Sequence, residues 1–299
     1  MVLAGAVLAA TASIASGAAV DARVLGTFRM RATVTTAVNV SGEHRGQVLW
    51  RRWTVAPLDC AGSVCQELAL DRQRSNHIFD QVLLYRTAPG QYAGSGAFYF
   101  GLRCKRRVYP RGGRAPYRIA LTVTGAVSVQ DVMFASSLTA TYVNPRRSDA
   151  TRCPLGSSHD AARYVGTATA PLPGPPTVSF TVQPSPASET VAFTDTSAPG
   201  LGGAPLVAWS WSFGDSASGA ADSSSLQDPM HTFSAPGSYQ VTLTAIDANG
   251  LAASDTQTVT VSAPAPTSPA PSAARSPARG AAGAPARLRR TGTAAGRRR

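Results

Sequence analysis

Apolar and polar residues alternate with a period of two along most of the first half of the chain. The alternation is clear in Phe28–Val34, where it runs on to Val40, and in Tyr92–Leu102. Successive side chains of a β-strand point to opposite faces, so these stretches predict strands with one buried face. Further strands are predicted at Val48–Val55, Gln66–Arg72, Gln81–Arg86, Pro116–Gln130 and Val132–Val143. Short strands separated by turns favour an antiparallel β-barrel or sandwich over residues 23–169.

Two details of this segment leave alternatives open. Trp50 and Trp53 fall on opposite faces of one strand, so we expect one of them to be exposed or to lie under a loop. Residues 159–164 fit either one short helical turn or a last edge strand. No stretch keeps the 3.6-residue period of a helix, so an all-β fold is predicted.

The alternation returns in residues 177–262, where one stretch is rich in aromatic residues. Trp209, Trp211 and Phe213 are two apart, so all three face one side of a strand that Gly214 and Asp215 end in a turn. Burying them requires a facing layer, and truncating any one to Ala would cost roughly 3–5 kcal/mol. About seven short strands in this region predict an Ig-like β-sandwich.

Four motifs in this region resemble the PKD domain (the polycystic kidney disease repeat). They are Phe193–Ser197, Trp209–Asp215, Asp228–Phe233 and Pro236–Leu243. The resemblance covers residues 177–262 and implies an Ig-like sandwich used outside the cell, as an adhesion or spacer module often attached to secreted hydrolases or surface proteins. The core positions are Phe193, Trp209, Trp211, Phe213, Asp215, His231, Tyr239 and Val241. Residues 23–169 resemble no family that we can name.

Two departures from the family pattern affect what the resemblance implies. Some PKD domains bind calcium through acidic residues before the tryptophan strand, but residues 198–205 here contain no carboxylate. Calcium prefers six to eight oxygen ligands with several acids among them, so we expect no tight calcium site and no metal. The family usually continues Gly-Asp-Gly, whereas Ser216 follows Asp215 here. A looser turn and a longer insertion, up to Ser225, are therefore predicted.

Charge divides the chain into segments more sharply than the global net charge of +12 does. Residues 1–175 carry 20 basic and 9 acidic side chains, residues 176–262 carry 7 acidic and no basic ones, and residues 263–299 carry 8 arginines and no acid. This segregation supports two domains and a basic tail. The heavy use of Arg, Ala, Gly and Pro is typical of a GC-rich bacterial genome.

The remaining segments are predicted from their composition. Val2–Ala19 is small and apolar and predicts a secretory signal peptide over residues 1–22, cleaved after Ala19 or Ala22, with a membrane anchor as the alternative. Residues 170–176 are proline-rich and predict a short semi-rigid linker. Residues 263–299 are rich in Pro, Ala and Ser and then in Arg, with too few large apolar residues to offset the entropy of ordering, and predict a disordered Arg-rich tail. A weak sortase-like pattern at residues 288–292 lacks the proline of that signal.

All four cysteines, Cys60, Cys65, Cys104 and Cys153, lie in the first domain. An even number of cysteines in an exported chain favours disulfides, and we favour the pairs Cys60–Cys65 and Cys104–Cys153 among three pairings. A zinc site using all four thiolates is the alternative, although the spacings lack paired CxxC motifs.

The candidate chemistry points to binding rather than catalysis. The sequence has no metalloprotease, serine-hydrolase or phosphate-loop motif, and His44, His77, His159 and His231 are scattered. A basic loop with interleaved tyrosines could bind an anionic polymer, or could be a solvated hairpin. It contains Arg103, Lys105, Arg106, Arg107, Arg111 and Arg114.

Together these observations predict an exported, non-enzymatic two-domain β protein without a cofactor, located at the cell surface or secreted. Its expected partners are a cell-envelope polymer, a glycan or an extracellular protein, with peripheral electrostatic contact to the envelope and no nucleic acid. One alternative is a ligand-carrying β-barrel in the first domain, which a deep apolar pocket would favour and a filled core would exclude. Another is an accessory component of secreted polysaccharide degradation. The oligomeric state is not predicted.

Overall fold

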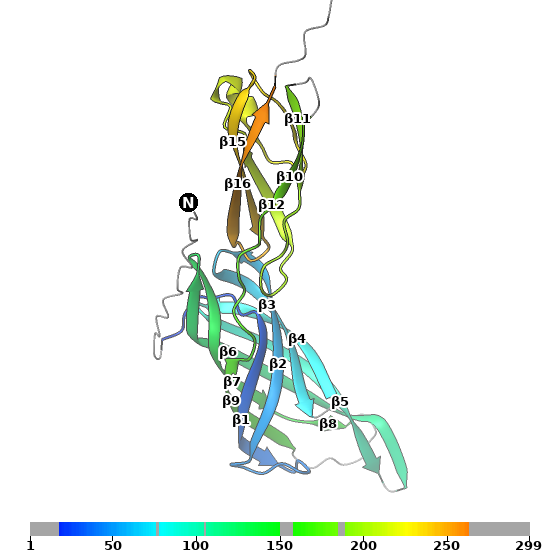
Figure 1. The fold of residues 1–299 in the computed structure, drawn as a ribbon. Coiled ribbons are helices and arrows are strands. Elements are labelled where there is room, and N and C mark those ends of the chain that lie inside the picture. Colours follow the sequence, from blue (N-terminus) through cyan, green and yellow to red (C-terminus); the bar gives the residue numbers. More distant parts are fainter. Residues whose placement is uncertain (1–17, 76–77, 105, 150–157, 185–188, 263–299) are drawn as a thin grey trace, which may run out of the picture. The chain divides into compact units, whose positions relative to one another are not determined.

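The computed structural model describes residues 18–75, 78–104, 106–149, 158–184 and 189–262 (Figure 1). The predicted signal peptide, apart from its last residues, and the predicted tail lie outside the described residues. Among the described residues the structure is almost entirely β, with one short 3₁₀ segment, η1, at Ser216–Asp222.

The first domain is one antiparallel sheet. Its strands are β1 (Gly26–Val38), β2 (Val48–Ala61), β3 (Val64–Ser75), β4 (Ile78–Ala88), β5 (Gln91–Cys104), β6 (Arg107–Val129), β7 (Val132–Asn144), β8 (Ser148–Asp149) and β9 (His159–Ala168). Strands β1 to β7 lie where the alternation predicted strands, usually a few residues longer. Of the two tryptophans on β2, Trp53 is fully buried and Trp50 is exposed, as their opposite faces led us to expect.

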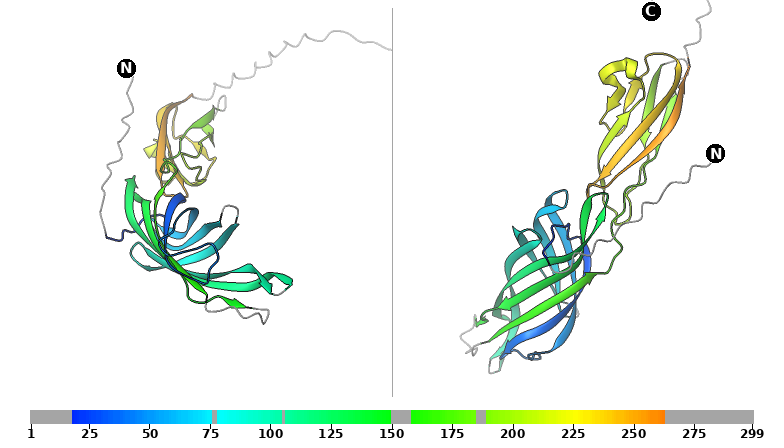
Figure 2. Two further views of the ribbon diagram at one scale, coloured as in Figure 1. Left: turned by 90° about the horizontal axis from the view of Figure 1, so that it is seen from below. Right: turned by 90° about the vertical axis from the view of Figure 1, so that its left-hand side faces the viewer.

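The sheet closes on itself to form a β-barrel. Its order is β5-β4-β3-β2-β1-β9-β7-β6, and β5 also pairs with β6, which completes a ring of eight strands. Figure 2 shows these strands curving round. The ladders differ in length: β4 and β5 share three register pairs, Tyr85↔Ala93, Arg86↔Tyr92 and Ala88↔Gln91, whereas β6 pairs with β5 over most of that strand. The barrel, rather than the sandwich, is therefore the architecture of this domain.

Of the two expectations for residues 159–164, the helical turn was wrong, and the last strand was right except for its edge position. These residues belong to β9, which is neither a helical turn nor an edge strand. It lies between β1 and β7 and pairs with both, with Arg163 opposite Thr33 on one side and Thr141 on the other. β9 is therefore the strand that closes the barrel.

The centre of the barrel is filled by the inward-facing residues of its strands. Phe28, Met30, Trp53 and Leu68 are completely buried there, and the rings of Trp53 and Tyr164 lie 4.7 Å apart. The middle of the barrel is thus a packed core rather than a deep apolar pocket.

Cysteine pairing is partly resolved. Cys60 and Cys65 form the predicted disulfide across the hairpin that joins β2 to β3, so four free thiolates are not available for the alternative zinc site. Cys104 is also disulfide-bonded. Cys153, the partner that we predicted for it, lies outside the described residues.

The second domain is a seven-stranded sandwich. One sheet contains β10 (Phe180–Pro184), β11 (Thr190–Asp195) and β14 (Met230–Thr232), and the other contains β12 (Leu206–Ser212), β13 (Ser223–Ser224), β15 (Gly237–Asp247) and β16 (Ala252–Val261). The rings of Trp211 and Phe193, from opposite sheets, lie 5.4 Å apart in the core. Trp211 and Phe213 are buried as expected, whereas Trp209 is half-buried at the side of this core.

The conformation of the turn after the aromatic strand requires a glycine at position 214. Gly214 has φ of +69°, a left-handed conformation that favours glycine. A Cβ atom at this position would lie 2.6 Å from the carbonyl oxygen of Gln240, so there is also no space for a side chain. The segment that follows contains η1 and β13 before β14 begins, and the predicted greater length of the insertion relative to the family stays a prediction.

Candidate site at the mouth of the barrel

One end of the barrel is sealed by the segment before β1. The backbone of Arg23 donates to Met133 O at 2.8 Å and accepts from Ala135 N at 2.9 Å, and Ala22 and Val24 are completely buried. Asp21 accepts hydrogen bonds from Arg86 and from the Gly90 N–H. Partial burial would raise the pKa of Asp21, but these hydrogen bonds and the Arg86 charge lower it overall.

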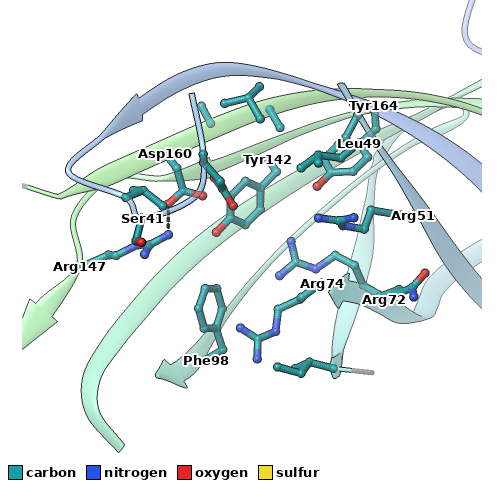
Figure 3. Close-up of a pocket in the computed structure, with 18 residues that line it drawn as sticks. Ser41, Leu49, Arg51, Arg72, Arg74, Phe98, Tyr142, Arg147, Asp160 and Tyr164 are labelled. Carbon is teal, nitrogen blue, oxygen red and sulfur yellow. Dashed lines mark hydrogen bonds and ion pairs between the residues drawn. The ribbon is translucent and has the colours of Figure 1, made fainter. Parts of the chain in front are cut away.

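The opposite end, at the β1–β2 and β3–β4 connections, contains a pocket of about 250 Å³ (Figure 3). Two residues that line it, Ser41 and Ile78, are exposed at the surface, so the pocket opens to solvent. We call this pocket the mouth. Figure 3 shows Arg51, Arg72 and Arg74 on one side of it, with Asp160 and Arg147 on the other.

The arginines of the mouth come from inward-facing positions of two neighbouring strands. Arg72 and Arg74 on β3 continue the buried series of Leu68 and Leu70. Arg51 on β2 is two residues before the buried Trp53, which pairs with Arg72. Continuing this antiparallel register by two residues places Arg51 opposite Arg74. Directly opposed like charges destabilise a sheet unless an anion compensates them.

Arg72 has its own counter-ion. Its Nε and Nη2 atoms donate to the two carboxylate oxygens of Asp80 at 2.9 and 2.8 Å. Its guanidinium also lies over the rings of Tyr117 and Tyr142, 4.3 and 4.8 Å from their centroids. Burial disfavours the charge on Arg72, but the hydrogen bonds and charge of Asp80 outweigh this effect and raise its pKa. Arg72 is therefore a satisfied structural cation.

Arg74 is less well compensated. Its Nε lies 3.7 Å from the same Asp80 carboxylate and is buried without a hydrogen-bond partner among the described residues. Its guanidinium stacks over Phe98 at 3.8 Å. Burial lowers the pKa of Arg74, and repulsion from Arg72 adds to this effect although Asp80 opposes it. Arg74 remains charged at neutral pH, so it presents a positive charge that lacks a full counter-ion.

Arg51 forms no ion pair with any described residue. It donates from Nη1 to the backbone carbonyl of Trp50 at 3.0 Å. On the far side of the mouth, Arg147 pairs with Asp160 at 2.9 Å. Glu43 also lines the mouth; burial, followed by repulsion from Asp160, raises its pKa, although attraction to Arg147 and Arg51 opposes this shift. Arg51 and Arg74 are thus the arginines of the mouth that donate to no carboxylate of the described residues, whereas Arg72 and Arg147 do.

Tyrosines supply further donors to the mouth. Burial raises the pKa of Tyr142 and of Tyr164, which both line it. Burial and the charge of Asp80 raise the pKa of the neighbouring Tyr117 to about 12. These hydroxyls therefore stay protonated at neutral pH and can donate hydrogen bonds. Arginine and protonated tyrosine are hydrogen-bond donors, so these side chains can bind an anion.

The basic loop predicted from the sequence lies elsewhere. Its described residues belong to the β5–β6 hairpin and are exposed, and Arg111 stacks over Tyr99 at 4.5 Å. Lys105 lies outside the described residues. The other members are Arg103, Arg106, Arg107 and Arg114. The structure therefore keeps these arginines together on one hairpin but does not bring them into the mouth.

The polar core residues predicted for the second domain interact with one another. Asp215 accepts hydrogen bonds from the backbone N–H and hydroxyl of Ser234, and His231 Nε2 lies 3.3 Å from its carboxylate. Desolvation raises the pKa of Asp215, but the Ser234 and His231 interactions lower it overall. His231 stacks on Phe213 at 4.2 Å. This cluster is buried, so it positions the turn after the aromatic strand and offers no accessible reaction site.

Three other core residues complete the predicted set. The Trp209 indole N–H donates to Asp195 at 2.8 Å. Tyr239 is half-buried and donates its hydroxyl to the Ala235 carbonyl at 2.6 Å, while Val241 is completely buried.

The described part of the chain has neither grouped metal ligands nor a membrane-spanning helix. No three His, Cys, Asp or Glu side chains gather there in a way that could hold a metal ion. None of the described helical segments is long and apolar enough to cross a membrane.

Comparison with known proteins identifies the second domain. The family model of the PKD domain matches residues 174–263. Among solved structures, the chain is similar to the PKD1 domain of Epp from Vibrio anguillarum, with 25% identity, 31% of this chain and 100% of that chain covered, and a TM-score of 0.27. It is also similar to the PKD1 domain of the metalloprotease PrtV from Vibrio cholerae, with 26% identity, coverage of 29% and 96%, and a TM-score of 0.25. No curated protein matches the chain. Residues 174–263 are therefore a PKD domain, as their motifs predicted, and the barrel before them has no family match.

Proposed function

We propose that this chain is an exported, non-enzymatic binding protein whose barrel takes an anionic ligand at its mouth. The PKD domain then acts as a spacer or as a second contact with protein or glycan. The observation that carries this proposal is the pair Arg51 and Arg74, which both line the mouth and donate to no carboxylate of the described residues within hydrogen-bond distance. The extracellular location rests on the use of PKD domains outside the cell and on the disulfide-bonded cysteines of the barrel.

The proposal revises the alternative in which the barrel carries an apolar ligand. A packed centre leaves no deep apolar pocket, so that form of the alternative loses its support. In the revised form the barrel still carries a ligand, but the ligand is anionic and binds at the mouth.

Binding of small anions to the full chain tests this function. Acetate and inorganic phosphate are titrated while the tryptophan and arginine side-chain resonances are followed by NMR. We expect saturable shifts in the mouth that weaken with added salt and are lost in the double variant Arg51→Gln plus Arg74→Gln. Arg52→Gln is the matched control, because Arg52 is exposed on the outer face of the same strand. Equal binding by the wild type and the double variant would contradict the proposal.

The exposed β5–β6 hairpin favours a second candidate function. Its arginines could hold an anionic polysaccharide by charge, as the basic loop suggested. Binding of dextran sulfate should then weaken with salt and in the double variant Arg106→Ala plus Arg107→Ala. Indifference to both changes would exclude this hairpin as the binding surface.

A further inference from the structure

The charge of the mouth restricts which anions it would hold, if the function proposed above is right. The four arginines Arg51, Arg72, Arg74 and Arg147 face the three carboxylates of Glu43, Asp80 and Asp160 in and behind the pocket. One positive charge is in excess. A group with a single negative charge, such as a carboxylate, would balance it, whereas a phosphate monoester near neutral pH would bring nearly two charges.

The depth of the mouth excludes a long apolar tail. Directly inside it, the barrel is filled by completely buried side chains, among them Met30, Trp53 and Leu70. A fatty acid whose carboxylate reached the arginines would have to place its chain either in this filled core or in solvent, and both are unfavourable. A compact body next to the carboxylate fits the space better.

The walls of the mouth suit a ring. The aromatic side chains of Phe98, Tyr142 and Tyr164 line it together with Leu49, and the tyrosine hydroxyls are donors. Aromatic faces pack against the C–H faces of sugars, and hydroxyl and guanidinium donors bind sugar oxygens. A volume of about 250 Å³ is below the common range of roughly 300–1,000 Å³ for ligand pockets, so the mouth has space for one ring rather than for a chain of them.

We propose that the mouth binds the terminal uronic-acid residue of a carboxylated glycan. The carboxylate lies between Arg51 and Arg74 and replaces the counter-ion that these residues lack. The sugar ring lies against Phe98, Tyr142 and Tyr164, and the rest of the glycan leaves through the solvent-exposed edge at Ser41 and Ile78.

Calorimetric titration of the full chain with defined sugars tests the proposal. The probes are glucuronate and galacturonate, their dimers, and glucose, glucose 6-phosphate and laurate as comparisons. We expect a uronate to bind at least tenfold more tightly than glucose, glucose 6-phosphate or laurate. Loss of a hydrogen bond to a charged group weakens binding about tenfold to a hundredfold, so Arg51→Gln and Arg74→Gln should each have an effect of this size. Arg52→Gln should have none.

The comparisons separate failure of this inference from failure of the proposed function. Tight binding of glucose 6-phosphate, or of laurate, that depends on Arg51 and Arg74 would overturn the uronate assignment and keep an anion site at the mouth. Binding of no probe, together with no response to acetate or phosphate, would overturn both. A circular dichroism spectrum and thermal midpoint equal to those of the wild type show that each variant is folded.

Discussion

Trp50 and Trp53, which lie three residues apart on β2, show how the two faces of the barrel wall differ. Trp53 is completely buried and packs on Tyr164, whereas Trp50 is 52% exposed and lies under the guanidinium of Arg29 at 4.4 Å. The same side chain therefore contributes differently to stability at the two positions.

Replacing each tryptophan with alanine measures this difference. Trp53→Ala removes a large core side chain and should lower the free energy of unfolding by roughly 3–5 kcal/mol. Trp50→Ala removes a cation–π contact at the surface and should cost within about 1 kcal/mol. Urea unfolding of the two variants checks the prediction. Similar costs would mean that the phase of β2 is not the one described.

Asp215 makes the stability of the PKD domain depend on pH. Its folded-state pKa is lowered, because its interactions with Ser234 and His231 outweigh desolvation. A carboxyl with a lowered folded pKa adds stability above its ordinary pKa and loses this contribution as the pH falls through the folded value. The loss should therefore begin below about pH 4.

The variant Asp215→Asn tests this dependence. We expect it to unfold at a lower temperature than the wild type at pH 7, and the difference should narrow as the pH falls below about 4. Calorimetry across this pH range measures the unfolding temperature of the PKD domain in the wild type and in the variant. A difference that stays constant down to pH 2 would show that the Asp215 charge is not the group responsible.

At the scale of elements, β9 determines whether the first domain is a ring. It pairs with β1 through ten register positions and with β7 through eight. A strand with neighbours on both sides has its amides bonded alternately to one neighbour and to the other, so consecutive amides are all protected.

Hydrogen exchange distinguishes a central strand from an edge strand. In native full-length protein we expect the amides of residues 161–165 to be protected one after another. An edge strand would instead show every second amide exchanging rapidly. NMR of the exchanged protein resolves the individual amides, and the alternating pattern would contradict the closed barrel.

Local patterns in the sequence predicted the strands but not their closure. A period of two reports which residues share a face, and it is the same in a barrel and in a sandwich. What closes the barrel is the pairing of β1 with β9, in which Phe28 lies opposite Ala168. Pairing between segments so distant leaves no local signal, so the barrel remained one of two expectations and β9 was misplaced. The PKD domain was predictable because its turns and aromatic strand are themselves motifs.

The mouth was missed for a different reason. The sequence drew attention to the consecutive arginines near residue 106, because clustered charge is easy to see. The informative signal was charge at inward-facing positions: Arg72 and Arg74 continue the phase of Leu68 and Leu70, and Arg51 keeps the phase of Trp53 and Val55. Reading the strand phase through the charged residues would have placed these arginines inside the barrel. Arg147 follows β7 and could not have been found in this way.

At the scale of the whole molecule, the segment before β1 is part of the barrel. The two predicted cleavage points differ in what they leave of it. Cleavage after Ala19 keeps Asp21 on Arg86 and Gly90, and keeps the buried Ala22. Cleavage after Ala22 removes both residues and places a charged amino group on Arg23, whose backbone nitrogen donates to Met133.

Two shortened chains, beginning at Val20 and at Arg23, test this difference. The first should match the full chain in thermal stability. The second should be less stable by about 1–3 kcal/mol, because a buried methyl group is lost and a new charge is placed in a mostly buried position. Calorimetry compares the two, and equal stability would show that the segment does not seal the barrel.

The ladder between β4 and β5 is the shortest in the ring. Strands that share only three register pairs separate at a smaller free-energy cost than strands paired along their whole length. Transient separation there would turn the ring into a curved sheet with two free edges, each able to accept a strand from another molecule. The β4–β5 ladder is therefore the place where two copies of the chain would exchange strands if the ring opened.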